Sequence, residues 1–113
     1  MKILIVHAHP EPQSFTTALR DLAVETLQGQ GHEVQVSDLY AMNWNPVASA
    51  ADFVERENSE YLVYALEQRL GVKKGVLAAD IQSELDKLLW ADTLILNFPL
   101  YWFSVPAILK GWI

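Results

Sequence analysis

The chain has 113 residues, and just over half of them are hydrophobic, which suits the core of one small domain and excludes an intrinsically disordered chain. A net charge of −6 argues against non-specific binding to nucleic-acid phosphates. Because the chain has no cysteine, it forms no disulfide, no zinc site with thiolate ligands and no cysteine nucleophile.

The first predicted element is a strand at Ile3–Val6, a continuous apolar run that is typical of a strand buried on both faces. This run is too short for the apolar region of a signal peptide, and no stretch approaches the length of a membrane span. A cytoplasmic protein with no membrane span is therefore expected. After the strand, Ser14 is placed to cap a helix whose apolar residues follow a helical period up to Leu27. Gly29 and Gly31 are expected to end that helix.

A second strand is predicted in the segment "HEVQVSDLY", where apolar and polar residues alternate as they do in an edge strand. Residues 40–60 are expected to be irregular, and a short helix is predicted at Tyr61–Leu70. Asp80 is placed to cap a further helix. The apolar run Thr93–Phe98 predicts a third strand, and Pro106 fits the first turn of a last helix.

Alternating strands and helices predict an α/β fold with a parallel sheet, in which the strand order is 2-1-3. The third strand is apolar throughout, yet no further segment of the chain can pair with its far side. We therefore expect residues 1–113 to be the N-terminal portion of a larger domain, truncated after the third strand.

The candidate site lies where the first and third strands end, because open parallel sheets bind ligands at the point where strand order reverses. One loop there leads from His7 and His9 to the helix that Ser14 caps, and helix N-termini favour phosphates. The other loop holds Trp102 and Phe103 between two prolines. Adjacent large aromatic residues cannot both enter one core, so this rigid loop favours contact with a flat ring cofactor.

Several other sites lack support in the sequence. Neither G-x-G-x-x-G nor a Walker A motif is present, which removes the usual dinucleotide and nucleotide signatures. His7 and His9 have the spacing to share a metal ion, but two ligands without a third are a weak signal, and no metal is expected. The more ordinary arrangement packs one histidine at the sheet end and bonds the other in the loop. A receiver domain would need an acidic cluster at the strand ends, where this chain has His-Ala-His.

Three segments, "ILIVHAHPEPQSF", "VSDLYAMNWNPV" and "NFPLYWFSVPAILKGWI", resemble the NAD(P)H:quinone oxidoreductase (DT-diaphorase-like) family, which has a flavodoxin-like fold. The resemblance runs from residue 1 to residue 113 and is weakest at about residues 50–75. It implies an FAD-dependent enzyme, rather than an FMN-dependent one, that takes hydride from NADH or NADPH and passes two electrons to a quinone. It also implies a homodimer.

The resemblance carries over to individual residues of this chain. It implies that the loop before the first helix contacts the FAD diphosphate and ribityl chain, and that the aromatic loop lines the isoalloxazine through its backbone. Trp102 and Phe103 would also form a wall of the pocket that nicotinamide and quinone share. The implied cofactor-binding residues are His9, Ser14, Phe15, Thr16, Pro99, Leu100, Tyr101, Trp102 and Phe103.

No catalytic residue is assigned within this chain, since the family's glycine-rich loop and its proton-relay pair lie beyond residue 113. Two alternatives to the quinone reductase stay open. One is a flavin-binding regulatory subunit without catalytic activity. The other is an inactive truncated fragment.

Overall fold

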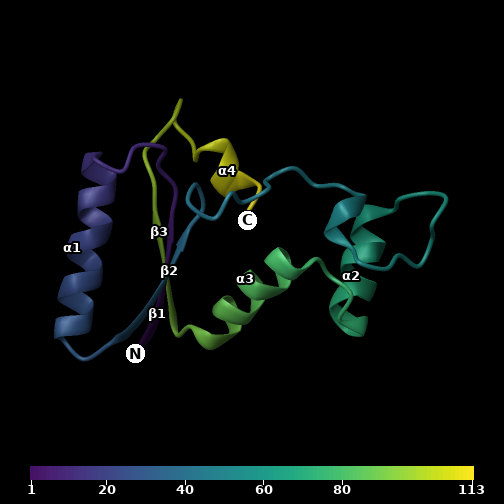
Figure 1. The fold of residues 1–113 in the computed structure, drawn as a ribbon, viewed down its shortest axis with the longest axis horizontal. Helices are drawn as coiled ribbons and strands as arrows, with labels where there is room; N and C mark the ends of the chain where they lie inside the picture. Colours follow the sequence, from purple (N-terminus) through teal and green to yellow (C-terminus); the bar gives the residue numbers. More distant parts are fainter. The chain divides into compact units, whose positions relative to one another are not determined.

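The computed structural model describes all of residues 1–113, and the chain divides into two compact units (Figure 1). The first unit combines Met1–Pro46 with Asp86–Ile113, and the second is Val47–Leu85. No helix of the structure has the length and apolar character needed to cross a membrane.

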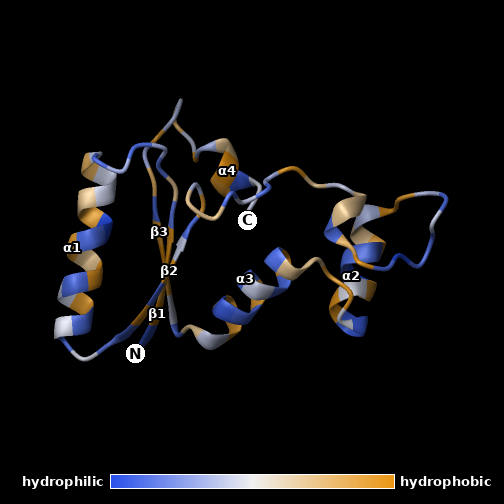
Figure 2. Cartoon of the chain, viewed as in Figure 1, coloured by the Kyte–Doolittle hydropathy of each residue, from blue (hydrophilic) through white to orange (hydrophobic).

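The first unit is built on a parallel sheet of three strands, β1 (Lys2–His7), β2 (Glu33–Asp38) and β3 (Thr93–Asn97), in the order β2-β1-β3. The central strand β1 is buried from Ile3 to His7, as its continuous apolar sequence requires. The predicted fold class and strand order are therefore confirmed, and the second strand is an edge as expected. Figure 2 shows hydrophobic colour concentrated along β1 and β3.

Helix α1 (Phe15–Gly29) lies against β1 and β2 (Figure 1). Ser14 caps it as predicted, because the Ser14 side chain accepts the N–H of Thr17. At the other end Gly31 has a φ of 89°, a conformation that glycine adopts without strain, and the chain turns there into β2.

The last helix, α4 (Ala107–Lys110), begins after Pro106, which is buried at its N-cap position. Leu109 of this short helix is fully buried and anchors it to the first unit. Proline suits this position because its missing N–H is not needed at the start of a helix.

The second unit contains a 3₁₀ turn, η1 (Ala50–Asp52), helix α2 (Tyr64–Lys74) and the start of helix α3 (Ala79–Trp90), which continues into the first unit. Phe53 and Leu77 are buried there and form an isolated bridge. The ring of Phe53 also packs against that of Tyr64, with centroids 5.2 Å apart.

The boundaries of α2 differ from the predicted helix at Tyr61–Leu70. It begins later because the N–H groups of Glu60 and Tyr61 donate to the Asn58 side chain, which commits these residues to a turn. It continues past Gly71, where a Cβ would collide with the Leu77 side chain, so this glycine serves close packing. The helix stops at Gly75, whose φ is 70°.

Two smaller predictions about helix and strand ends also need correction. Helix α3 begins at Ala79, so Asp80 lies in its first turn and does not cap it. The third strand ends at Asn97, one residue earlier than expected.

Candidate functional site

The two predicted site loops leave adjacent strands at the same edge of the sheet. His7 at the end of β1 is the register partner of Asn97 at the end of β3, and the N–H of Ala8 donates to the Asn97 carbonyl at 3.1 Å. The Asn97 side chain also donates to the carbonyl of Thr16 in the first turn of α1, at 2.9 Å. The structure thus joins the start of α1 to the strand that feeds the aromatic loop.

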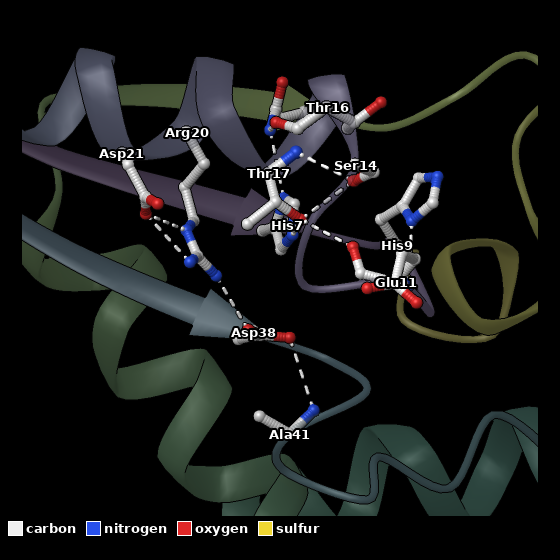
Figure 3. Close-up of polar contacts among 11 residues, drawn as sticks. His7, His9, Glu11, Ser14, Thr16, Thr17, Arg20, Asp21, Asp38 and Ala41 are labelled. Carbon is white, nitrogen blue, oxygen red and sulfur yellow. Dashed lines mark hydrogen bonds and ion pairs between the residues drawn. The ribbon is translucent and has the colours of Figure 1, made fainter.

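The β1–α1 loop is held by local hydrogen bonds (Figure 3). The Ser14 hydroxyl accepts the N–H of Thr17 at 3.1 Å and donates to the Thr17 hydroxyl at 3.0 Å. The N–H groups of Phe15 and Thr16, the first two of the helix, make no hydrogen bond within the chain. Unsatisfied donors of this kind, at the positive end of the helix dipole, bind phosphate groups well.

His9 lies in this loop with one ring nitrogen engaged. Its Nδ1 accepts the N–H of Glu11 at 2.9 Å, so a neutral ring carries its proton on Nε2. Nε2–H is then a donor for a ligand at the loop. His7, in contrast, is buried at the sheet end with 1% of its surface exposed. The ordinary arrangement of the two histidines is therefore the one observed.

The aromatic loop between β3 and α4 forms a two-residue hairpin. Tyr101 and Ser104 exchange both backbone hydrogen bonds, at 3.0 and 3.1 Å. The central residues Trp102 and Phe103 have φ angles of 49° and 66°, the left-handed signs that a type I′ turn requires at both positions. Their side chains are 93% and 96% exposed, so neither fills the core of this unit.

Two consecutive aromatic residues in this conformation are unusual, because such turns favour asparagine and glycine. Each left-handed non-glycine residue costs about 1–3 kcal/mol, and strain of this size gathers at functional sites. The turn exposes both rings and leaves the N–H groups of Trp102 and Phe103 without a hydrogen bond in the chain. It can therefore present two donors and two ring faces to a ligand.

A pocket of about 270 Å³ lies beside the β1–α1 loop, at the C-terminal ends of β1 and β2. On its wall the Arg20 guanidinium donates to Asp38 at 2.8 Å and to Asp21 at 2.8 Å (Figure 3). Of the predicted site residues, the pocket includes His9 and does not include the aromatic loop. Its lining residues are His7, His9, Pro10, Pro12, Thr17, Arg20, Asp38, Tyr40 and Ala41.

Metal ligands do not gather anywhere in the chain: no group of three or more His, Cys, Asp or Glu side chains is arranged to hold an ion. Both ring nitrogens of His7 have hydrogen-bond partners inside the protein, in Thr17 and Asn97. The alternative of a metal shared by His7 and His9 therefore has no geometric support.

Comparison with known proteins identifies the family. The model of a family described as having a flavodoxin-like fold matches residues 1–113, the whole chain. The chain belongs to this family. It is 51% identical over 112 residues to ribosyldihydronicotinamide dehydrogenase [quinone] of Homo sapiens, and 52% identical over 112 residues to NAD(P)H dehydrogenase [quinone] 1 of Rattus norvegicus. The resemblance seen in the sequence is thus confirmed.

A solved structure also superimposes closely on this chain. A putative quinone reductase from Klebsiella pneumoniae is 50% identical, with a TM-score of 0.95 over 99% of this chain. The match covers 43% of the length of that structure. The matches to the human and rat relatives include 98% of this chain and cover 48% and 41% of those proteins, respectively. It therefore spans less than half the length of each of these flavodoxin-like relatives.

Some contacts within the candidate site were not predicted from the sequence. Asn97 links the two loops, yet it looked like an ordinary strand residue because its partners lie far away in the chain. The hydrogen bond between Thr17 and His7 was not predicted either. The ion pair between Arg20 and Asp38 was missed for the same reason. The one available signal was Asn97 itself, a polar residue that ends an apolar strand.

Proposed function

We propose that the full-length protein is an FAD-dependent NAD(P)H:quinone oxidoreductase, and that residues 1–113 form the N-terminal portion of its flavin-binding domain. The observation that carries the proposal is the strained turn at Trp102 and Phe103, which presents two free N–H donors and two exposed rings. The relatives also support the proposal, because about half of the aligned residues are identical in proteins named as quinone dehydrogenases.

The residues present suit a flavin dinucleotide. Free N–H groups of Phe15 and Thr16, with Nε2–H of His9, offer donors to a diphosphate at one loop. Ser14 supports them indirectly, since its hydroxyl is already engaged with Thr17. Asn97 links this loop to the strand that feeds the other loop, so both can serve one extended ligand.

The aromatic loop supplies the remaining contacts of the proposed site. The N–H groups of Trp102 and Phe103 are donors for the carbonyl and ring nitrogens along the edge of an isoalloxazine. Pro99, Leu100 and Tyr101 shape the backbone that approaches it. When bound, the flavin supplies the capacity to accept hydride and to pass on two electrons.

In this proposal the chain's own contribution is orientation. The exposed rings of Trp102 and Phe103 provide a flat wall against which nicotinamide and quinone each stack, so that the reacting atoms are held at close range. The fixed N–H groups of Trp102 and Phe103 would offer hydrogen bonds to the flavin edge without having to rearrange during the reaction. The chain itself contains no group that we assign to proton transfer.

A homodimer and a cytoplasmic location remain predictions that go with this function. So does the preference for FAD over FMN. The exposed rings at the aromatic loop are compatible with a second subunit that closes the same pocket.

The decisive experiment purifies the full-length protein and measures its visible absorption, its flavin and its turnover. We expect a yellow protein that releases FAD on denaturation and reduces quinones with NADH, NADPH or a ribosyl dihydronicotinamide. A colourless protein that takes up neither FAD nor FMN would overturn the proposal, and released FMN would correct the cofactor. Bound flavin without quinone reduction would favour the regulatory alternative.

Site variants then assign the role of the aromatic loop. Trp102→Ala and Phe103→Ala should each lower kcat/KM for the quinone by about tenfold or more, as removing one well-placed contact of about 1.4 kcal/mol does. Leu89→Ala is the matched control, because Leu89 is also large, apolar and 85% exposed but lies on α3. Equal kinetics for all three variants would remove the assigned role.

A further inference from the structure

A chain of directed hydrogen bonds runs through His7, which the proposed mechanism does not use. Its Nδ1 lies 3.0 Å from the side-chain nitrogen of Asn97, and its Nε2 lies 3.3 Å from the hydroxyl of Thr17. These two partners belong to β3 and α1. His7 therefore bridges the strand end and the helix start that enclose the candidate site.

Which atoms donate and which accept in this hydrogen-bond network follows from the two backbone carbonyls at its ends, those of Thr16 and Glu11. On one side Asn97 donates its amide N–H to the Thr16 carbonyl, and a flipped amide would place two acceptors against each other. The amide nitrogen is therefore fixed in place, and its second N–H points at His7 Nδ1, which must accept.

The hydrogen bond between His7 and Thr17 indicates the same tautomer of His7. The Thr17 hydroxyl donates its single proton to the Glu11 carbonyl at 3.0 Å. It can then only accept from His7, so His7 Nε2 carries the proton. The Ser14 hydroxyl donates to the same Thr17 oxygen. Only a neutral imidazole with its proton on Nε2 satisfies every member of the network.

We propose that His7 is a positioning residue for the β1–α1 loop, and that it holds the cofactor-binding geometry only as the neutral Nε2–H imidazole. This inference rests on the proposed function, because the loop is the one assigned to the flavin diphosphate. His7 acts through Thr17 and Asn97 and touches no substrate.

The surroundings favour the neutral ring. Burial lowers the pKa of His7 below its ordinary value of 6.5, and the positive Arg20 and the neighbouring His9 lower it further. Asp38 and Asp21 oppose this shift, and β3 contributes no charged residue at all. A protonated ring would place Nδ1–H against the amide hydrogens of Asn97 and break the link between β3 and the loop.

The direction in which FAD affinity changes with pH distinguishes the hydrogen-bond network of His7 from a direct attraction between a charged His7 and the diphosphate. A positive imidazolium near a diphosphate would tighten binding as the pH falls. The network predicts the opposite: affinity is constant while folded His7 is neutral, and it weakens as the pH falls through the pKa of folded His7, which lies below the ordinary value of 6.5.

The test measures FAD affinity of the full-length protein from about pH 8 to about pH 5. His7→Leu should weaken FAD binding about tenfold at neutral pH, as expected for the loss of one or two buried hydrogen bonds, and should lose the pH dependence. His7→Gln should retain most of the affinity, because its amide offers one donor and one acceptor, and its profile should be flat because it does not titrate. His32→Gln is the control at the opposite end of the sheet and should keep the wild-type profile.

A readout without flavin keeps the two proposals distinguishable. In the flavin-free protein, ¹⁵N NMR should show His7 neutral with its proton on Nε2 at neutral pH, and His7→Leu should speed exchange of the Thr17 amide. A charged ring, an Nδ1–H tautomer, or affinity that rises at acid pH would overturn the positioning role. If the wild type binds no flavin, the proposed function fails, and the NMR and exchange results alone decide the role of His7.

Discussion

Gly111 lies against Pro46, so close that a Cβ at residue 111 would overlap the Pro46 carbonyl oxygen and its Cβ. The φ of Gly111 is −71°, a value open to any residue, so glycine is needed here for space and not for backbone conformation. This contact fixes the end of α4 against the segment that follows β2. Both belong to the first unit.

We therefore expect Gly111→Ala to lower the free energy of unfolding by about 1–3 kcal/mol, as overpacking against backbone does. Chemical denaturation of the full-length protein measures it. Gly29→Ala is the matched control with the opposite sign: nothing lies within 4 Å of its Cβ, and the residue is helical. It should be neutral or stabilising by up to about 1 kcal/mol. A stable Gly111→Ala variant would show that Pro46 moves away at little cost.

The helix cap makes a second prediction. Ser14→Ala removes the acceptor for the Thr17 N–H and one donor to its hydroxyl, so it should cost about 1 kcal/mol of stability. It should also weaken FAD binding, since the free N–H groups of the first turn lose their support. Ser83→Ala, at an exposed position inside α3, should leave both quantities unchanged or raise stability slightly. Isothermal calorimetry and thermal unfolding, run on both variants, separate these outcomes.

The strained turn makes a prediction in which stability and activity move in opposite directions. Replacing Trp102 by Asn and Phe103 by Gly introduces the residues that a type I′ turn prefers. Unfolding of the flavin-free protein should become harder by about 1–3 kcal/mol, while quinone reduction falls. A less stable double variant would mean that the rings pack in the folded protein and that the turn is not strained for function.

A fourth prediction concerns Glu67, whose buried carboxylate accepts the N–H groups of Glu57 at 2.9 Å and Asn58 at 3.1 Å. These two bonds lower the pKa of Glu67 below its ordinary value of 4.5. The stabilisation is therefore complete above about 4.5 and is lost as the pH falls through the lower pKa of the folded protein.

Glu67→Gln replaces one acceptor oxygen by a donor that faces an N–H. Amide exchange at residues 57 and 58 should become faster and should no longer depend on the titration of residue 67. Glu60→Gln, on the exposed part of the same loop, is the control. Unchanged protection in Glu67→Gln would show that the loop is held by other contacts, such as the ion pair between Lys74 and Glu57.

The order of the elements, and the position of the two candidate loops along the chain, could be predicted from the sequence alone. The short apolar, β-branched run Ile3–Val6 favours a buried strand, Ser14 is a preferred helix-cap residue, and adjacent aromatic residues cannot both enter one core. Each of these inferences depends on neighbours within a few residues. Helix α2 was misplaced because the fold packs Leu77 against Gly71, which makes this glycine a packing residue and not a stop.

How the two loops are joined could not be predicted from the sequence, because it depends on side chains that only the fold brings together. The hydrogen bonds of His7, Asn97 and Thr17 connect residues up to 90 positions apart, and no local pattern carries that information. The left-handed turn at Trp102 and Phe103 likewise arises because Tyr101 and Ser104 pair across it. Local propensity places elements along the chain, but the direction of a buried hydrogen bond depends on which donors and acceptors the fold brings together.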